Sequence, residues 1–593
     1  MARKAVVLCG NDELPDPYLI QILDFFEIPW ESVSPAALFD LREISTPESY
    51  SLLSTLPLMS RIWSAGAAGG SLPPLLQRAE SIFLFGGQQS SGTDALLQFL
   101  TASRDTRIAR LELGVTSCSI SDRHVDICGP MSGLRMAVPV RLELTILMSS
   151  STQIERLIWS NEGCLFGVAA CQTQRFYLAP SATLIDINAP VNKTYFDIAD
   201  YFLSAVPLVM YLQCAFRGVI PRPVDNGACL IIDDPPLRSH YGFVDLKRLA
   251  TLSAEHRFTC TIAFIPWNWN RSRSFAVELF RSHADRLSLS IHGCDHTGGE
   301  FAAMNTAVIN RQAKLAMARM QKHSALTGLP YDRVMVFPQG AFSSVSLGVL
   351  KHNGFIAAVN TEVSPTDQPK SATVGDVWRL AILKYADFAI YTRRYAFHGV
   401  HNFAFDLLLG KPCLIVTHHA DFKDGGRDVV DFIDRVNALP VPLAWRGLGE
   451  VVRRAHQQWL REDGTYHIRM WGGEVLIPNP AANARHFVVE KFERRPEGLE
   501  GLDVSGRRVA FHLDGERLRF ELEVGPQQAA RICIAYRDLF GAPPKRAWRA
   551  QLKVAARRYL SECRDEAQPL IRWIPATRSG KGLNWKAREQ DGK

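Results

Sequence analysis

Residues 229–236 of this 593-residue chain read Cys-Leu-Ile-Ile-Asp-Asp-Pro-Pro. A short apolar run that is followed by turn-forming residues, here two aspartates and a proline pair, is typical of a β-strand buried on both faces. Asp233 and Asp234 then stand at the carboxyl end of that strand. Two adjacent carboxylates in such a place are costly to bury unless another group uses their charge. The stretch therefore predicts a buried parallel strand with a functional site at its end.

The chain after this stretch alternates strand and helix signals. Pro221-Arg222-Pro223 indicates a linker in front of it. Seven strands are expected, most of them followed by a helix, at residues 228–232, 258–265, 287–291, 333–337, 355–360, 378–383 and 413–417. This alternation favours a parallel sheet. We expect residues 226–460 to form a deformed (β/α)7-type barrel.

Separate domains are expected on both sides of the barrel, in a chain that is α/β overall. In residues 1–222, apolar runs ending at glycines alternate at first with helix-like stretches, which favours a doubly wound α/β domain. Residues 465–540 hold short strands at the spacing of a small β-sandwich. Residues 541–593 are expected to form a basic helix, near residues 545–560, and a Gly/Lys-rich tail.

The first domain ends in a run of strand signals, the last of which is Arg-Phe-Tyr-Leu-Ala-Pro at residues 175–180. This succession resembles the glutamine-amidotransferase-like domains found beside glycan-active barrels. Such enzymes need a cysteine on a sharp strand-to-helix turn, and the turn at residues 86–92, Gly-Gly-Gln-Gln-Ser-Ser-Gly, has none. It also lacks the lysine of a phosphate-binding loop. We interpret the domain as non-catalytic.

A histidine pair follows the third expected strand of the barrel. Residues 287–296 read Leu-Ser-Leu-Ser-Ile-His-Gly-Cys-Asp-His. His292 and His296, four residues apart, can share a metal ion. With Asp234 they make three ligands, which leaves positions open for water and substrate. The pattern predicts a catalytic site for one divalent metal ion, and zinc is the expected ion.

Other strand ends carry residues suited to the same site. His418 and His419 follow the last strand, where one of them can protonate a leaving amine. A Pro/Gly turn at residues 337–342 can aim backbone N–H groups at an oxyanion, and tryptophans after the second strand can stack on a sugar ring. The residues expected to contact substrate are Trp267, Trp269, Gly340 and Phe342.

Together these motifs resemble the polysaccharide deacetylase superfamily (NodB-like, carbohydrate esterase family four), over about residues 226–450. That family has paired aspartates on the first strand, a histidine pair on the third, a proline-glycine turn on a middle strand and a histidine on the last. The resemblance implies that Asp233 is the general base and that Asp234, His292 and His296 hold the metal. It also implies that His418, or its neighbour His419, is the general acid.

The sequence departs from the family at three places. The usual Thr-Phe-Asp-Asp-Gly is here Ile-Ile-Asp-Asp-Pro, at residues 231–235. The arginine that precedes the proline-glycine turn and helps to set the base aspartate is replaced, because Val336 and Phe337 stand there. The family's Asp-Trp motif is matched only by residues 376–378, Asp-Val-Trp. The chain is therefore identified as a divergent member.

The expected activity is metal-dependent N-deacetylation, that is, amide hydrolysis, of an acetylated sugar or polysaccharide intermediate. A glycoside hydrolase on a related barrel is one alternative, although no second carboxylate is as well placed as the Asp233-Asp234 pair. A non-catalytic glycan-binding protein of surface polysaccharide biosynthesis is the other. An amide hydrolase for a substrate other than a sugar also stays open, because fold and metal do not name the substrate.

Composition and charge narrow the expected surroundings of the chain. The twelve cysteines are scattered without regular spacing, which is typical of buried thiols in a reducing compartment. No apolar stretch is long enough for a transmembrane segment and no signal peptide is recognisable, so we expect a cytoplasmic protein. Residues 541–593 carry a local charge of +8, which suits an acidic partner or a membrane surface. No nucleic-acid-binding module is recognisable.

Overall fold

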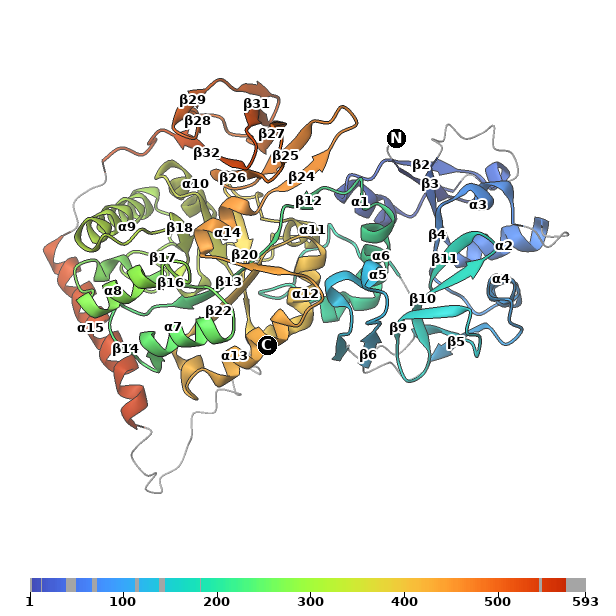
Figure 1. Ribbon diagram of the computed structural model, residues 1–593, viewed down its shortest axis with the longest axis horizontal. Coiled ribbons are helices and arrows are strands. Elements are labelled where there is room, and N and C mark those ends of the chain that lie inside the picture. The colour runs from blue at the N-terminus through green and yellow to red at the C-terminus, as the bar shows by residue number, and fades with distance from the viewer. Residues whose placement is uncertain are drawn as a thin grey trace.

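The computed structural model describes residues 3–11, 13–38, 49–66, 72–111, 117–137, 144–181, 183–542 and 547–571. A mixed α/β domain built from the first part of the chain lies at one end of the molecule (Figure 1). A nearly closed barrel of parallel strands forms the larger lobe, and a β-structured domain sits on one side of it (Figure 1). The α/β class expected from the sequence is therefore the class observed.

The barrel sheet is parallel at every pairing. Its strands are β13 (Asn226–Asp233), β16 (Cys260–Phe264), β17 (Leu287–His292), β18 (Val334–Val336), β19 (Ala357–Asn360), β20 (Ile390–Thr392), β21 (Arg394–Tyr395), β22 (Cys413–His418) and β23 (Leu443–Trp445). The order is β20-β19-β18-β17-β16-β13-β22-β21, with β23 beside β13. Arg393 alone separates β20, at one edge, from β21, at the other. The sheet thus nearly closes at this residue.

The apolar run of β13 is buried on both faces, and its residues alternate between two cores. Cys229 and Ile231 pack with residues of the neighbouring strands in one cluster. Leu230 and Ile232 belong to a larger cluster that includes residues of the helices around the sheet. This division explains why the strand is apolar at every position. The apolar run ends at Asp233, the last residue of β13, and Asp234 follows it at the rim of the barrel.

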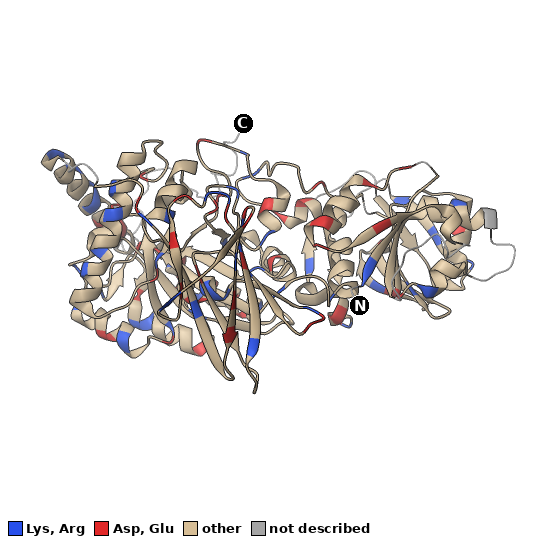
Figure 2. Cartoon of the chain, turned by 90° about the horizontal axis from the view of Figure 1, so that it is seen from above, with Lys and Arg blue, Asp and Glu red and all other residues tan. Residues whose placement is uncertain are grey.

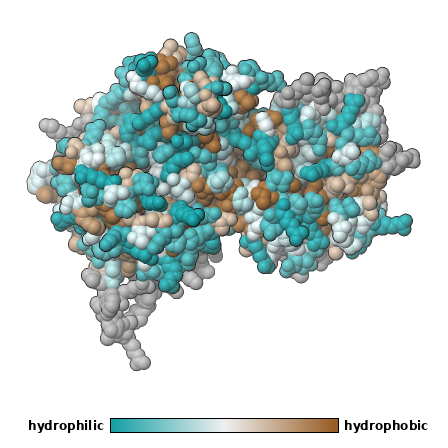
Figure 3. Space-filling view, viewed as in Figure 1, coloured by the Kyte–Doolittle hydropathy of each residue, from teal (hydrophilic) through white to brown (hydrophobic). Residues whose placement is uncertain are grey.

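Helices cover the outside of the barrel sheet. They are α7 (Leu246–Glu255), α8 (Ser274–Ser282), α9 (Thr306–Thr327), α10 (Ser344–His352), α12 (Val400–Leu408), α13 (Arg427–Asn437) and α14 (Leu448–Arg454). Asp245 caps α7, since its carboxylate accepts hydrogen bonds from the backbone N–H groups of Lys247 and Arg248 at 2.8 and 3.1 Å. The outer surface is mostly hydrophilic, and apolar residues gather in the seam between the two lobes (Figure 3).

One expected strand, at residues 378–383, is wrong. Helix α11 (Val374–Trp378), which starts with Thr373 and Asp376 in a capping box, ends at the first residue of this range, and Ile382 forms only an isolated bridge with Ile390. The apolar residues of this segment are buried for another reason. Trp378 packs edge-on against Phe25 of the first domain, and the strand that completes the sheet lies later, at β20 and β21.

The first domain has a mixed sheet. Its parallel part runs in the order β2 (Trp30–Val33), β1 (Lys4–Leu8), β3 (Tyr50–Thr55), β4 (Ser81–Phe85) and β11 (Gln174–Ala179). The sheet continues through antiparallel β10 (Cys164–Cys171), β9 (Ile154–Trp159), β6 (Ser117–Ile120) and β7 (Arg135–Ala137), with β8 (Leu144–Met148) and β5 (Arg107–Leu111) at its side. The glutamine-amidotransferase-like character of this domain stays a prediction.

The helices of this domain flank its sheet and connect it to the barrel. They are α1 (Pro17–Phe25), α2 (Leu56–Gly66), α3 (Pro74–Arg78), α4 (Ser91–Thr101), α5 (Val125–Cys128) and α6 (Phe202–Ala215). Within the described ranges, residues 198–215 are the one helical segment long and apolar enough to cross a membrane, and 72% of this window is buried inside the molecule. Burial of this extent is typical of a core helix.

The domain after the barrel consists of two facing sheets. One contains β12 (Arg222–Pro223), β24 (Gln457–Leu460), β25 (Tyr466–Met470), β27 (Arg485–Phe492), β31 (Arg517–Val524) and β30 (His512–Asp514). The other contains β26 (Glu474–Asn479), β32 (Gln528–Tyr536), β28 (Leu499–Val504) and β29 (Arg507–Val509). Their inward side chains form one apolar cluster. The expected linker contributes β12 to the first of these sheets.

The last described element is helix α15 (Trp548–Ile571), which is longer than the helix expected near residues 545–560. It lies along the barrel beside the short strand β14 (His240–Tyr241), which pairs with β15 (Val244–Asp245) (Figure 1). The expected Gly/Lys-rich tail, at residues 572–593, lies outside the described residues.

Candidate active site

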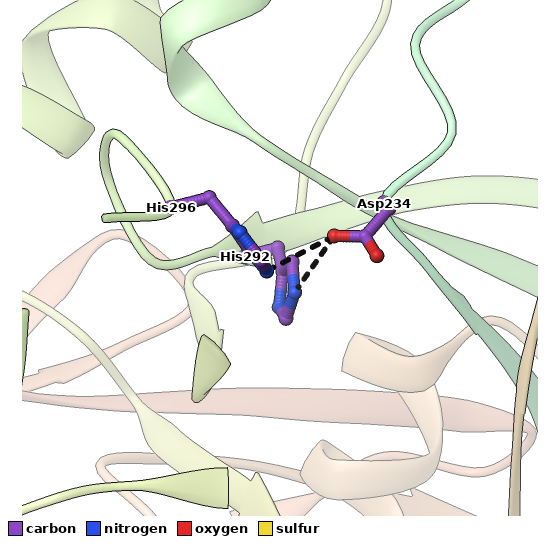
Figure 4. A group of neighbouring side chains, drawn as sticks. All are labelled: Asp234, His292 and His296. Atoms are coloured by element: carbon purple, nitrogen blue, oxygen red, sulfur yellow. Dashed lines mark ion pairs between the residues drawn. The ribbon is translucent and has the colours of Figure 1, made fainter. Parts of the chain in front are cut away.

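Asp234, His292 and His296 converge at the carboxyl ends of β13 and β17 (Figure 4). Asp234 Oδ1 lies 3.3 Å from His292 Nε2 and 3.1 Å from His296 Nε2. The three ligand atoms lie within 4.8 Å of one another. The structure thus brings together the three residues that the sequence predicts as metal ligands.

The backbone holds these side chains in uncommon conformations. Asp234 has φ = 86° and His296 has φ = 54°, a region that non-glycine residues seldom adopt. Strain of this kind is kept where the surrounding structure fixes it, which is common at functional sites. Here it turns both side chains toward the end of β17.

A second hydrogen bond sets the tautomer of His292. Its Nδ1 lies 3.0 Å from the carbonyl oxygen of Val336, which can only accept, so Nδ1 carries the proton. When the ring is neutral, Nε2 then presents a lone pair toward Asp234. An imidazole whose other nitrogen donates to a backbone carbonyl is the usual arrangement of a metal-binding histidine.

The residues present fit a divalent metal ion. Asp234 Oδ1 is buried and accepts no hydrogen bond from the residues that the structure describes, yet two imidazole nitrogens approach it. Burial raises the pKa of Asp234, but the two histidines outweigh this and hold the pKa well below its usual range. The carboxylate is therefore ionised, and one carboxylate with two imidazoles is a donor set that zinc accepts.

Glu300 fixes the turn that carries the second histidine. Its carboxylate accepts hydrogen bonds from the backbone N–H groups of Cys294, Asp295 and His296, at 2.7, 3.1 and 3.2 Å. Burial raises the pKa of Glu300, while these donors favour its charged form. The residue carries no signature in the sequence, because only the folded turn directs three N–H groups at one carboxylate.

Asp233 is almost completely buried beside the triad and forms an ion pair with Arg393. Both guanidinium–carboxylate distances are 2.7 Å, so the pairing is bidentate. Burial raises the pKa of Asp233, but Arg393 and the nearby imidazole of His292 hold it below its usual value. Arg393 thus contacts the candidate base directly, and it comes from the junction of β20 and β21.

His418 and His419, the two candidate general acids, have different surroundings. His418 Nε2 lies 3.9 Å from Asp233 Oδ2, its side chain is 41% exposed, and its ring stacks on Tyr395. His419 is buried, and its ring meets the edge of Tyr241. His419 Nε2 lies 3.9 Å from the carboxylate of Asp565 in α15. His418 is therefore the one that faces both Asp233 and solvent.

The residues expected to contact substrate do not share one environment. Trp267 lies edge-on to Tyr559 of α15, and Trp269 lies under the ammonium group of Lys322. Phe342 is fully buried and stacks on Phe337, so its side chain is part of the core. A sugar contact by either tryptophan, or by the backbone at Phe342, stays a prediction.

Gly340 lies at the edge of the site, in a turn whose positive φ favours glycine. It has φ = 66°, and a Cβ atom would overlap the carboxylate of Glu362, which follows β19. Its N–H donates to the carbonyl of Phe337 at 3.2 Å. An oxyanion contact by Gly340 stays a prediction. Glu362 was not among the residues predicted from the sequence. It lies at this rim because it follows the end of β19.

Comparison with known proteins gives structural neighbours that cover part of the chain. No family model and no curated protein matches the chain. The neighbours include a putative polysaccharide deacetylase from Mycobacterium smegmatis, at 12% identity over 39% of this chain and 92% of that one, with a TM-score of 0.27. A peptidoglycan N-acetylglucosamine deacetylase matches at 13% over 39% and 90%, with a TM-score of 0.24.

A third neighbour is a pseudoenzyme of carbohydrate esterase family four from Bacillus anthracis. It is 12% identical over 39% of this chain and 66% of that one, with a TM-score of 0.24. The first two neighbours are thus described as deacetylases and the third as a pseudoenzyme. We derive the function of this chain from the geometry of its own site.

Proposed function

We propose that the barrel is a metal-dependent N-deacetylase that acts on an acetylated sugar or a polysaccharide intermediate. The observation that carries the proposal is the convergence of Asp234, His292 and His296 beside two proton-transfer groups, Asp233 and His418. Three protein ligands leave room for water and substrate, as catalytic sites require. This arrangement suits hydrolysis of an amide.

Asp234, His292 and His296 would hold the ion. When bound, a divalent ion supplies Lewis-acid activation of the carbonyl group and of water. Asp233 is kept ionised by Arg393, so it can take the proton of the attacking water. His418 faces the same carboxylate and is partly exposed, so it can protonate the departing amine. Acetate and a free amine are the products.

The contacts of Asp233 disfavour a glycoside hydrolase. Both of its oxygens are engaged by Arg393, at 2.7 Å each. A carboxylate held in this way is poorly placed to attack a sugar carbon as a nucleophile, whereas it can still accept a proton. For the substrate we propose a nucleotide-linked or lipid-linked sugar, or a surface polysaccharide intermediate, met in the cytoplasm.

Metal content and product release test the proposal. We expect about one divalent ion per chain by elemental analysis, and loss of the ion in a folded Asp234→Ala, His292→Ala variant. The metal-loaded protein should release acetate from N-acetylated sugar oligomers, and the variant should not. Release of reducing sugars without acetate would favour the glycoside hydrolase. Metal binding without turnover of any acetylated glycan would favour the binding protein.

A further inference from the structure

Helix α15 is docked on the loops that surround the active site. Tyr241, after β13, donates a hydrogen bond to Asp565 at 2.7 Å. Arg271, after β16, makes a bidentate pair with Glu562 at 2.7 and 2.8 Å. His419, after β22, faces Asp565 as described above. One face of the helix is therefore held at the rim where the metal ligands stand.

The docked face is polar. Its buried residues are Val554, Arg558, Glu562 and Asp565, which recur every three or four positions. Three of these four are charged, and their partners on the barrel loops are also polar. An amphipathic helix in a globular protein normally buries its apolar stripe instead. The apolar residues of α15 must therefore lie elsewhere on the helix.

Four large apolar side chains of α15 are exposed. Trp548 is 65% exposed, Leu552 60%, Tyr559 53% and Leu560 72%. At about 100° per residue, these four positions fall within one stripe of about 120°. Tyr559 also contacts Trp267 at the rim, so the stripe begins at the mouth of the barrel.

Basic residues lie along one side of this stripe. At about 100° per residue, Lys553, Arg557 and Arg564 fall next to Leu560 in the helical wheel, and Arg549 falls within the stripe itself. All four residues are exposed. Lys and Arg residues line the helix at the left-hand end of the molecule (Figure 2). An exposed apolar stripe with a basic border is the pattern of a helix that lies in a membrane interface.

Two loops at the same rim expose apolar side chains as well. Met304, in the segment after the histidine turn, is 55% exposed, and Phe397, after β21, is 73% exposed. The carboxyl ends of parallel strands meet at one edge of a barrel, so these loops share that edge with α15. Apolar contacts are thus available from both the helix and the rim.

We propose that α15 binds an anionic lipid surface and so seats the mouth of the barrel against a membrane. The apolar stripe inserts among the acyl chains near the headgroups, and the basic border meets the lipid phosphates. The polar pairs on the docked face keep the helix fixed to the active-site loops meanwhile. A substrate that is anchored in the lipid would then enter the site from the membrane side.

Vesicle sedimentation tests this proposal on the full-length protein. The wild-type chain should sediment with vesicles of phosphatidylcholine and phosphatidylglycerol, and much less with phosphatidylcholine alone. Leu552→Glu, Leu560→Glu should lower the bound fraction at least about tenfold, because both side chains are exposed and belong to the stripe. Arg549→Gln, Lys553→Gln should lower binding to the anionic vesicles specifically, by about fivefold per charge.

A matched control separates the helix from general surface apolarity. Leu513 lies in β30 and is 47% exposed. The variant Leu513→Glu makes the same change away from the helix, and it should bind vesicles as the wild type does. Soluble-substrate turnover should be equal in all these variants. The proposal is overturned if the wild type ignores anionic vesicles, or if the α15 variants bind as well as Leu513→Glu does. It is also overturned if the stripe variants only change the oligomeric state in the absence of lipid.

Discussion

Arg393 and Asp233 form a bidentate ion pair in which both nitrogen–oxygen distances are 2.7 Å and both side chains are 3% exposed or less. The arginine occupies the single position between β20 and β21, where the barrel sheet nearly closes. The pair therefore links the closure of the barrel to the ionisation of the candidate base. Arg393 acts through Asp233, and so it is a positioning residue.

Replacing Arg393 should change both stability and pH dependence. Arg393→Leu leaves a buried carboxylate unpaired, which should cost about 3–5 kcal/mol in the free energy of unfolding. Arg393→Lys keeps the charge but loses the bidentate geometry. Because Arg393 lowers the pKa of Asp233, the acidic limb of the kcat/KM profile should move to higher pH in the lysine variant.

Arg394 provides the control for this experiment. It pairs with Asp406 at 2.6 Å and is equally buried. Arg394→Lys should therefore lower the melting temperature without moving the acidic limb. An acidic limb that stays in place in Arg393→Lys would contradict the role of Arg393 in setting the base.

Replacing His418 and replacing His419 should have different effects on catalysis and on stability. His418→Ala should reduce kcat by about 10²–10⁴-fold with little change in melting temperature, because His418 is partly exposed and faces Asp233. His419→Ala should instead destabilise the protein, because its buried ring packs against Tyr241 and faces Asp565. Steady-state kinetics and thermal unfolding of both variants measure the difference. If both variants lost kcat equally, the assignment of His418 as the general acid would be contradicted.

The candidate metal ligands could be predicted from sequence because each lies at or just after the end of a strand. Asp234 follows β13, His292 is the last residue of β17 and His296 lies in the turn after it, so the parallel order places them at one edge. Arg393 could not be predicted in this way. The segment before it was expected to hold a strand at residues 378–383, and the closing strand in fact comes later and is broken at Arg393 itself.

The docking of α15 could not be predicted from the sequence either. Its charge and apolar pattern indicate an amphipathic helix, but pattern alone assigns the apolar stripe to the interior. Here the charged face is buried. Glu562 pairs with Arg271 and Asp565 accepts a hydrogen bond from Tyr241, and both partners lie on loops more than 290 residues earlier in the chain. Such pairs between distant segments leave no periodic trace. For the same reason Glu362 could not be placed beside Gly340.

Gly340→Ala should damage the site. A Cβ atom there would displace the Glu362 carboxylate, and the positive φ adds about 1–2 kcal/mol of strain. We expect a lower melting temperature and a lower kcat. Gly348→Ala is the matched control, since Gly348 lies inside α10 and its Cβ atom would only touch Ala386 at 3.7 Å. That variant should gain about 0.5–1 kcal/mol in the free energy of unfolding. If Gly340→Ala behaved like Gly348→Ala, the close fit to Glu362 would be disproved.

Acid should destabilise the fold through a histidine far from the active site. His456 is completely buried, and burial lowers its pKa to about 4. In the unfolded chain the pKa of histidine is about 6.5, so the unfolded state binds the proton first as the pH falls. The stabilising contribution is therefore present above about pH 6.5 and is lost between about pH 6.5 and 4. Its size is about 3 kcal/mol for one histidine.

Urea unfolding of His456→Gln at about pH 7.5 and at about pH 4.5 measures this contribution. Glutamine does not titrate, so the variant should lose less stability between the two pH values than the wild type does, by about 2–3 kcal/mol. His323 and His398, whose pKa values burial also lowers to about 4, keep the remaining pH dependence in both proteins. His512 is exposed and serves as the control, so His512→Gln should lose the same stability between the two pH values as the wild type does. An unchanged pH dependence in His456→Gln would mean that the buried ring is already protonated in the folded protein.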